Sequence, residues 1–352
     1  MEKYAVIGLM SGTSLDGVDI AYCNFELEDD SWKFTIKETT TVKYAPEWHL
    51  NLKESIFKDA NQLQILDNLY GEYLGNLCKS FINKHKIKPD LIASHGHTVF
   101  HQPDKGFTLQ IGNGDKIAKI TNTPTVYDFR SLDVKLGGQG APLVPIGDRL
   151  LFKEYDFCLN LGGFANISFE KNTTRIAFDI CPLNIVINEV CEHIGLSFDK
   201  NGEIAKQGEV NTNLLNELND LKYYAQVFPK SLGKEFVLEE IQPLLNKYPI
   251  SIAHKLRTFY EHIAIQISKT INTETGETVL VTGGGTYNVY LLELIRKHIN
   301  RKIVIPSKTI IDFKEAMIFA FLGVLKKRGE NNCLASVTGA SQDCSGGILA
   351  IP

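Results

Sequence analysis

Apolar and polar residues alternate along the first third of the chain in a pattern that predicts paired β-strands. Apolar runs at 4–10 and 17–26 flank a short loop, and residues 32–44 alternate with period two. Between 61 and 86 the apolar residues recur three and four positions apart, which predicts an amphipathic helix. Further strands are predicted at 89–96, at the start of 107–120 before a short helix, and at 124–129.

The same arrangement begins again near the middle of the chain. Residues 157–170 predict a strand, a Gly-rich turn and a second strand, and 174–179 predict the next strand. Because strands then alternate with helices, the chain is expected to be α/β. The recurrence predicts a duplicated fold with a cleft between its halves. The remaining predicted elements are helices at 183–195, 239–248 and 252–271, a buried strand at 278–282, and a helix within 283–299.

A Gly- and Pro-rich stretch at 135–152 interrupts the pattern of strands and helices. We expect the chain to cross between its two lobes near this stretch. The predicted N-terminal lobe combines 1–130 with 333–352, and the predicted C-terminal lobe is 131–332.

Composition excludes several classes of protein. The formal net charge is −4 and no basic stripe stands out, which argues against a nucleic-acid partner. The longest apolar segment, 316–325, is too short to span a bilayer and is expected to be a buried helix. The N-terminal apolar run is too short for a secretory signal. Seven scattered cysteines without a CxxC motif indicate a reduced, cytoplasmic protein.

The loop between the first two predicted strands is rich in glycines and hydroxyls. Glycines allow a backbone to approach a ligand closely, and Ser11, Thr13 and Ser14 can donate hydrogen bonds to phosphate. The carboxylates of Asp16 and Asp19 are the oxygen ligands that Mg²⁺ prefers. The loop lacks the Lys of a P-loop and no helix follows it. Taken alone, it also fits a plain hairpin turn.

Two further Gly-rich loops strengthen the phosphate interpretation. Gly162, Gly163 and Asn166 repeat the pattern in the second half of the chain. The stretch Gly283, Gly284 and Gly285 joins a predicted strand to a helix, where helix N-termini favour anions and small residues leave room for a flat ring or ribose. Each loop by itself also fits an ordinary turn.

Three other positions carry candidate chemistry. Asp179 ends a predicted strand, where it fits either a general base or a helix cap. His95 and His97 share one face of a strand, which fits a metal site or contacts with a sugar. Arg130 fits a substrate carboxylate, or a structural ion pair with Asp128 or Asp133.

Taken together, the segments resemble those of the anhydro-N-acetylmuramic acid kinase family. The opening GLMSGTSLDGVD is similar to the N-terminal signature of that family. Matching segments follow in the same order over nearly the whole chain. They are HGHTVFHQP, LQIGNGDKIA, DFRSLDVKLGGQGAPLVP, NLGGFANIS, PKSLGKEF, VTGGGTYN, DFKEAMIFAFLG and SVTGASQ.

The resemblance implies a two-lobed, actin-like ATPase fold with duplicated ribonuclease H-like halves and a nucleotide cleft. It implies a cytoplasmic homodimer that uses ATP and Mg²⁺. The implied reaction converts 1,6-anhydro-N-acetylmuramic acid and water to N-acetylmuramic acid 6-phosphate, in peptidoglycan recycling and amino sugar catabolism.

The resemblance also assigns roles to residues. The family motif (F/Y)DTGPGN matches FDICPLN at 178–184, so Asp179 carries the catalytic role, while Ile180, Cys181 and Leu183 replace a Thr and two Gly. This replacement fits either a pocket reshaped for a related sugar or a shifted loop. The expected sugar contacts are His95, Asp128, Arg130 and Asn184. The expected ATP and phosphate contacts are Gly12, Thr13, Ser14, Leu15, Asp16, Gly17, Val18, Asp19, Gly162, Gly163, Asn166, Gly283, Gly284 and Gly285, with Mg²⁺ held through ATP by Asp16 or Asp19.

Two other functions fit parts of the sequence. A non-enzymatic or chaperone-like ATPase of the same fold would bind nucleotide without needing a sugar, although no separate peptide-binding domain is seen. A metal hydrolase would use His95 and His97. Neither alternative accounts for three phosphate-type loops together with Asp179.

Overall fold

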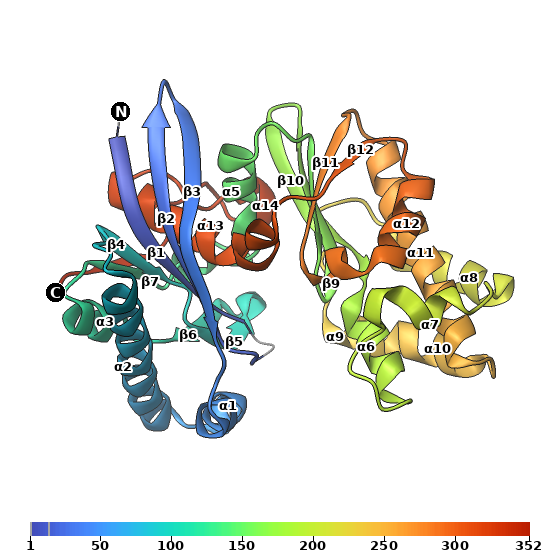
Figure 1. Ribbon diagram of the computed structural model, residues 1–352, viewed down its shortest axis with the longest axis horizontal. Helices are drawn as coiled ribbons and strands as arrows, with labels where there is room; N and C mark the ends of the chain where they lie inside the picture. Colours follow the sequence, from blue (N-terminus) through green and yellow to red (C-terminus); the bar gives the residue numbers. More distant parts are fainter. Residues whose placement is uncertain (1, 13–14) are drawn as a thin grey trace. The chain divides into compact units, whose positions relative to one another are not determined.

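The computed structural model describes residues 2–12 and 15–352, which form two compact α/β units (Figure 1). The N-terminal unit spans Met1–Phe152 and Phe313–Pro352, and the C-terminal unit spans Lys153–Asp312. The α/β class expected from the alternating pattern is confirmed in both units. The predicted cleft between lobes stays a prediction.

The N-terminal unit is built on a six-stranded mixed sheet. Its order is β13-β7-β4-β1-β2-β3, and the first hairpin, β1 and β2, pairs Ser11 with Val18 at its closed end. Strands β4 and β7 run parallel to β1, whereas β2, β3 and β13 continue the sheet through antiparallel pairs. The strands are β1 (Glu2–Ser11), β2 (Val18–Glu28), β3 (Ser31–Val42), β4 (Leu91–Ser94), β7 (Thr125–Tyr127) and β13 (Ile348–Ala350).

Helices cover both faces of this sheet. Ile7 and Leu9 of β1 share an apolar core with the long helix α2 (Ala60–His85). Gly8 points to the opposite face, where an added Cβ would lie 1.9 Å from the carbonyl oxygen of Ala316 in α13 (Lys308–Arg328). The other elements are α1 (Pro46–Lys53), η1 (Ser55–Phe57), β5 (His97–Gln102), η2 (Pro103–Lys105), β6 (Phe107–Ile111), α3 (Gly114–Thr121), α4 (Ser131–Lys135), α5 (Val144–Leu151) and α14 (Ala335–Thr338).

The C-terminal unit repeats the same sheet. Its order, β10-β9-β8-β11-β12, matches β3-β2-β1-β4-β7 in position and strand direction. The predicted duplication is therefore confirmed. The strands are β8 (Phe157–Leu161), β9 (Phe164–Lys171), β10 (Thr174–Pro182), β11 (Thr278–Thr282) and β12 (Lys302–Val304).

Helices surround this second sheet, and α11 contributes the largest buried helical face in its core. A single π-helical turn, η5, runs directly into α10. The helical elements are α6 (Asn184–Glu192), η3 (Lys200–Gly202), α7 (Glu203–Lys206), α8 (Thr212–Asn219), η4 (Lys222–Ala225), α9 (Lys234–Phe236), η5 (Val237–Ile241), α10 (Gln242–Lys247), α11 (Ile252–Asn272), η6 (Gly284–Tyr287) and α12 (Val289–His298).

The chain passes from one compact unit to the other after Phe152 and again after Asp312. These boundaries differ from the ones expected from the sequence. The expected boundaries were 130/131 and 332/333. The difference arises because α5 and most of α13 belong to the N-terminal core. Asp148 of α5 forms a buried ion pair of 2.6 Å with Lys314 of α13, and the Phe152 ring lies 5.3 Å from that of Phe34 in β3.

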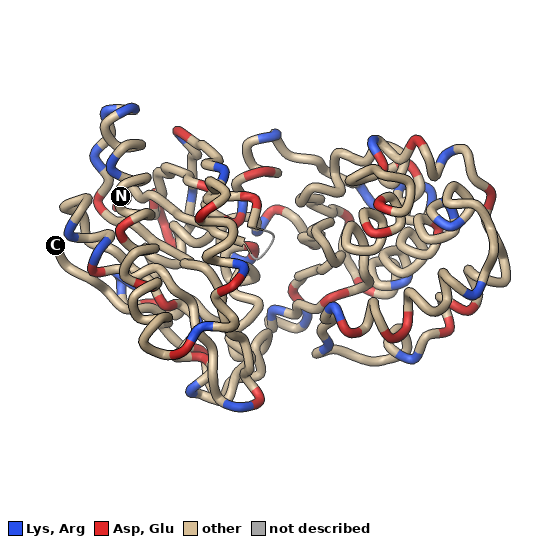
Figure 2. The backbone as a smooth tube through the Cα atoms, turned by 90° about the horizontal axis from the view of Figure 1, so that it is seen from below, with Lys and Arg blue, Asp and Glu red and all other residues tan. Residues whose placement is uncertain are grey.

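Charged residues of both signs are interspersed along both units, as the blue and red segments of Figure 2 show. Residues 316–325 lie inside α13 and are all buried, as the apolar run predicts. In the described part of the chain, none of the helices combines the length and the apolar character needed to cross a membrane.

Replacing Gly8 by Ala is expected to destabilise the N-terminal unit. The added methyl would overlap the α13 backbone, and overpacking of this kind costs about 1–3 kcal/mol or more. Urea unfolding of the full chain measures this loss. Gly163→Ala is the matched control, because nothing lies within 4 Å of a Cβ there. Equal unfolding free energies for the two variants would contradict the close packing of α13 on β1.

Candidate active site

The loops that carry the predicted site residues of the N-terminal unit lie at one edge of its sheet. Strands β1, β4 and β7 are parallel, so their carboxyl ends share that edge. The described residues of the loops that follow them are 12 and 15–17, 95–96, and 128–130. This register brings the opening loop, His95 and Arg130 to one place, although they are far apart in sequence.

The residues at the two ends of the opening loop, Ser11 and Gly17, are closely packed against their neighbours. Gly17 has φ +151°, and an added Cβ would lie 2.4 Å from the Val42 carbonyl oxygen. The Ser11 hydroxyl is already bonded to Tyr44 at 2.6 Å and Tyr70 at 2.8 Å, which makes it part of a buried hydroxyl network. Val18 is a core residue, so only its backbone could face a ligand.

The remaining predicted members of this loop differ in how far they are exposed. Asp16 is exposed, and Gly12 and Leu15 are half-buried, with Leu15 at φ +59°. Thr13 and Ser14 lie outside the described residues. The predicted ATP-binding role of the loop therefore stays a prediction.

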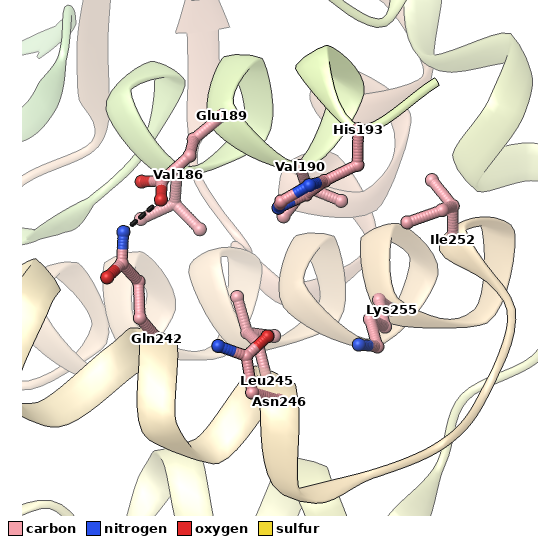
Figure 3. Close-up of a pocket in the computed structure, with 9 residues that line it drawn as sticks. All are labelled: Val186, Glu189, Val190, His193, Gln242, Leu245, Asn246, Ile252 and Lys255. Atoms are coloured by element: carbon pink, nitrogen blue, oxygen red, sulfur yellow. Dashed lines mark hydrogen bonds between the residues drawn. The ribbon is translucent and has the colours of Figure 1, made fainter.

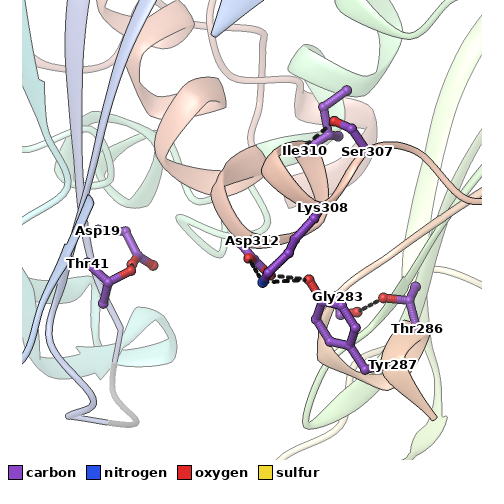
Figure 4. A network of polar contacts seen from close by, with 9 residues as sticks. All are labelled: Asp19, Thr41, Gly283, Thr286, Tyr287, Ser307, Lys308, Ile310 and Asp312. Carbon is purple, nitrogen blue, oxygen red and sulfur yellow. Dashed lines mark hydrogen bonds and ion pairs between the residues drawn. The ribbon is translucent and has the colours of Figure 1, made fainter. Parts of the chain in front are cut away.

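Two acidic residues lie near each other beside this loop. Asp19 on β2 accepts a hydrogen bond of 2.5 Å from Thr41 of β3 (Figure 4). Glu315 on α13 is exposed, and the charges of Arg130 and Asp19 act on the pKa of its carboxyl in opposite directions, Arg130 lowering it and Asp19 raising it. Carboxylate oxygens from two elements fit a hard divalent cation. Sequence reasoning missed Glu315, although it lies in the quoted segment DFKEAMIFAFLG.

His95 and Arg130 form a tightly bonded pair. The Nε and Nη2 of Arg130 lie 3.1 Å and 2.8 Å from His95 Nε2, and Nη1 donates to the Gly140 carbonyl oxygen at 2.7 Å. His95 Nδ1 lies 2.8 Å from the Gly96 carbonyl oxygen, which makes it the protonated ring nitrogen. Burial, together with the Arg130 charge, lowers the pKa of His95 to about 3.

The pairing of His95 with Arg130 argues against a metal-ligand role for His95 and against a structural ion pair for Arg130. Because His95 Nε2 accepts from a guanidinium, it is not available to a metal. Among the described residues, no ion pair joins Arg130 to Asp128 or Asp133. The Asp128 carboxylate instead accepts from the amide and hydroxyl of Ser131 at the start of α4. Arg130 has five N–H donors, of which three make these bonds.

His97 lies at the start of β5 and is buried. Its Nδ1 makes no hydrogen bond within the described part of the chain. Burial lowers the pKa of His97 to about 4. Within the described residues, the three-residue group with metal-ligand geometry contains neither His95 nor His97. The geometry thus gives no support to a histidine-based metal hydrolase.

The first Gly-rich loop of the C-terminal unit is held by the start of α6. The carbonyl oxygen of Gly163 accepts from the amides of Leu183 at 2.8 Å and Ile185 at 3.2 Å. Asn184 donates its side-chain amide to the Gly162 carbonyl oxygen at 2.8 Å. Asn184, predicted to contact the sugar, therefore also holds this loop in place.

The second Gly-rich loop of this unit packs directly on the first. An added Cβ on Gly283, which has φ +86°, would lie 2.6 Å from Asn160 Oδ1, and one on Gly285 would lie 2.7 Å from Leu161 Cβ. Gly284 and Gly163, by contrast, have nothing within 4 Å of an added Cβ. The packed glycines shape the loops, and the two open glycines leave room for a ligand.

An exposed aromatic ring follows this loop. Tyr287 donates to Asp312 at 2.5 Å, and Lys308 lies beside both residues (Figure 4). Thr286 donates to the Gly283 carbonyl oxygen at 2.6 Å and closes the turn. Tyr287 was not singled out from sequence, because an aromatic residue after a Gly-rich turn has no distinctive pattern.

Asp179 lies at a β-bulge near the end of β10. It pairs with Asn166 of β9, and the register shifts between Asp179 and Cys181. Bulges of this kind re-aim side chains next to active sites. Asp179 Oδ2 accepts from the Leu232 amide at 2.9 Å, and its main-chain oxygen accepts from the Tyr223 hydroxyl at 2.5 Å.

These contacts bear on the role of Asp179. The N-cap of α6 is Leu183, and it has no side-chain cap, so Asp179 is not a helix cap. Burial raises the pKa of Asp179 above its ordinary value, and the Leu232 amide limits the rise. A half-buried carboxylate with a raised pKa is suited to accept a proton. The segment 222–232 that holds Asp179 was not expected to do so from sequence.

The three residues that depart from the family motif all point into the core. Ile180, Cys181 and Leu183 are at most 2% exposed and belong to the core of the C-terminal unit. Their bulk therefore does not lie on the exposed surface around Asp179.

A small pocket lies elsewhere in the C-terminal unit, between α6, α10 and α11 (Figure 3). Its volume of about 40 Å³ suits a few water molecules rather than a sugar. Glu189 and Gln242 on its wall are hydrogen-bonded to each other. None of the predicted site residues lines it. Its lining residues are Val186, Glu189, Val190, His193, Gln242, Leu245, Asn246, Ile252 and Lys255.

Two sheets that share the order and direction of five strands, each with a Gly-rich loop between the strands of its first hairpin, define a duplicated α/β fold of the actin-like class. The model of the family described as anhydro-N-acetylmuramic acid kinase matches residues 4–351. The chain belongs to this family, and it is an ATP-using sugar kinase.

Relatives of full length support this assignment. Proteins named anhydro-N-acetylmuramic acid kinase from Aliivibrio fischeri and Vibrio parahaemolyticus are 34% and 36% identical, over 99% and 97% of both chains. The protein of that name from Bacillus thuringiensis is 31% identical over 100% of both chains.

Among solved structures, Acidaminococcus fermentans (R)-2-hydroxyglutaryl-CoA dehydratase component A covers 92% of this chain and 99% of its own, with 11% identity and TM-score 0.46. At this identity and TM-score, the structural similarity supports no conclusion about the function of the chain.

Replacing His97 by Gln is expected to flatten the dependence of unfolding free energy on pH. Between the ordinary His pKa of 6.5 and about 4, the unfolded chain binds more protons than the folded chain. The unfolding free energy of the native protein therefore falls as the pH drops through this range. His97 contributes up to about 1.4 kcal/mol per pH unit to this slope. Urea titrations at several pH values measure it, and equal slopes in both proteins would refute the assignment.

Proposed function

We propose that the chain converts 1,6-anhydro-N-acetylmuramic acid, ATP and water to N-acetylmuramic acid 6-phosphate and ADP. The observation that supports this most is the half-buried Asp179 carboxylate, held at a bulge of β10 in a full-length member of the kinase family. Relatives that match along their whole length carry the name of this activity. The reaction belongs to peptidoglycan recycling and amino sugar catabolism.

Asp179 acts as the general base in this proposal. It accepts a proton from water, whose oxygen forms a bond with the anomeric carbon of the sugar. The bond between that carbon and O6 breaks, and O6 then attacks the γ-phosphorus. The bond from that phosphorus to the bridging oxygen breaks, and ADP leaves. The Leu232 amide and the Tyr223 hydroxyl keep Asp179 in position.

Asp19 and Glu315, with Asp16, would hold Mg²⁺ together with the phosphates of ATP. Their oxygen atoms are the type of ligand that this ion takes, and the pKa of Glu315 reflects the nearness of Asp19. When bound, the ion neutralises charge on the transferred phosphoryl group. The open backbone at Gly163 and Gly284 is available to phosphate oxygens or ribose.

Arg130 binds the carboxylate of the sugar's lactyl group in this proposal. Neutral His95 and the Gly140 carbonyl oxygen hold the guanidinium, and its remaining N–H donors match a carboxylate. Asp128 and Asn184 shape the two loops on which sugar contacts depend. The enzyme is proposed to be a cytoplasmic homodimer, as the family resemblance implies.

Asp179→Asn is expected to lower kcat by about 10²–10⁴-fold, because the amide cannot accept the water proton. ADP release with the anhydro sugar measures kcat, and ATP binding should be unchanged. In the native enzyme, kcat/KM should rise with pH through the raised pKa of Asp179. Asp220→Asn is the matched control, since Asp220 is exposed in the same unit.

Two outcomes would count against the proposal. A near-normal kcat in the Asp179→Asn variant would show that Asp179 is not the general base. ATP hydrolysis that does not depend on any sugar would favour the chaperone-like ATPase instead.

Gly284→Ala is expected to raise the KM for ATP about tenfold, a loss of about 1.4 kcal/mol of binding. The new methyl meets no protein atom within 4 Å, so the unfolding midpoint should stay unchanged. The Gly163→Ala variant tests in the same way whether the loop between β8 and β9 approaches ATP. Unchanged KM values in both variants would show that neither loop approaches ATP.

A further inference from the structure

Two cysteines face each other near the C-terminus in a part of the N-terminal unit that the proposed reaction does not use. Cys333 and Cys344 form an isolated antiparallel bridge, exchanging both backbone hydrogen bonds at 3.0 Å and 3.1 Å. Residues that pair in this way have Cα atoms about 5.5 Å apart. That separation lies within the range of about 4.4–6.8 Å over which a disulfide closes.

The backbone around the pair is held firmly in this arrangement. The Asn332 side chain donates to the carbonyl oxygens of Leu322 and Gly346 at 3.1 Å and 3.0 Å, and accepts from the Gly346 amide at 2.7 Å. The Asp343 carboxylate accepts from the Ala335 amide at 2.7 Å. Both sides of the bridge are therefore anchored, and the two thiols stay opposed.

A buried carboxylate completes the cluster. Cys333 Sγ donates to Asp133 Oδ1 at 3.1 Å, and the ligand atoms of Asp133, Cys333 and Cys344 all lie within 4.8 Å of one another. Hydrogen bonding with Cys344 raises the pKa of Cys333, and the same bond lowers the pKa of Cys344. Cys344 is thus the thiol that ionises first, next to a second thiol and a proton acceptor.

We propose that Cys333 and Cys344 are a redox-active dithiol that a peroxide converts reversibly to a disulfide. The Cys344 thiolate attacks the peroxide, forming an S–O bond while the O–O bond breaks and hydroxide leaves. Cys333 sulfur then attacks Cys344 sulfur, the S–O bond breaks, and the hydroxide that leaves takes up the Cys333 proton by way of Asp133 and becomes water, while the first hydroxide takes up the proton that Cys344 had released. The two thiols lose two electrons to the peroxide, which ends as water.

A metal site is the other chemistry that these atoms offer, and the contacts favour it less. The Asp133 carboxylate already accepts from Thr338 at 2.7 Å and from the Gly140 amide at 2.7 Å, besides the Cys333 thiol. A metal would displace these donors, and within the described residues no fourth His, Cys, Asp or Glu joins the group.

Access favours reaction at Cys344. It is 5% exposed, and residues 341–343 immediately before it are exposed, whereas Cys333 is 1% exposed. The other five cysteines are also buried, and no disulfide joins any of the seven, all of which lie in the described part of the chain. In a reducing compartment, such a pair is expected to be a transient rather than a structural bond.

The test exposes the reduced full-length protein to hydrogen peroxide, blocks remaining thiols with an alkylating reagent, and identifies peptides by mass spectrometry. The expected product is a cross-linked peptide joining Cys333 and Cys344, which dithiothreitol restores to two thiols. Cys344→Ala keeps the Cys333 bond to Asp133 and should abolish the cross-link, and Cys78→Ala, a buried cysteine on α2, should leave it intact.

Two results would overturn the proposal. One is oxidation of Cys344 to a sulfinic acid with Cys333 still alkylated and no cross-link. The other is stoichiometric Zn²⁺, added as the metal alone and retained after dialysis by the native protein but not by Cys344→Ala.

Discussion

The close approach of α13 to β1 is the constraint on which most of the N-terminal unit depends. Gly8 has no side chain, so the Ala316 backbone lies directly on the central strand. This contact brings Glu315 within range of the charges of Asp19 and Arg130, and it places Lys314 against Asp148 of α5. The end of the same helix meets Asn332, whose side chain holds the segment that carries Cys333. One glycine therefore governs the position of two groups of reactive side chains.

Several predicted site residues also make structural contacts within the protein. Ser11 belongs to a buried hydroxyl network, Asp128 holds the start of α4, and Asn184 ties α6 to the loop at Gly162. A hydroxyl or amide in a Gly-rich loop satisfies backbone groups as readily as it binds a ligand. Conversely, Glu315 is not distinctive within an apolar helix, and only the fold brings it next to other charges.

The departures from the family motif around Asp179 change the core rather than the surface. A sequence shows that Leu183 is larger than Gly, and it does not show which way the side chain points. The bulge at Asp179 and Cys181 re-aims the strand, and Ile180, Cys181 and Leu183 fill the interior of the C-terminal unit. Asp179 is left half-buried, with its carboxylate held by the Leu232 amide.

The sequence by itself determined the α/β class, the duplication and the Gly-rich loops, because period-two and helical spacings and glycine turns are local patterns. It also placed Asp179 at the end of its strand. The tertiary structure alone decided which glycines are packed and which are open, and that His95 is paired with Arg130. It moved the unit boundaries to Phe152 and Asp312. These features depend on contacts between residues distant in sequence, and no local pattern records which residues will meet.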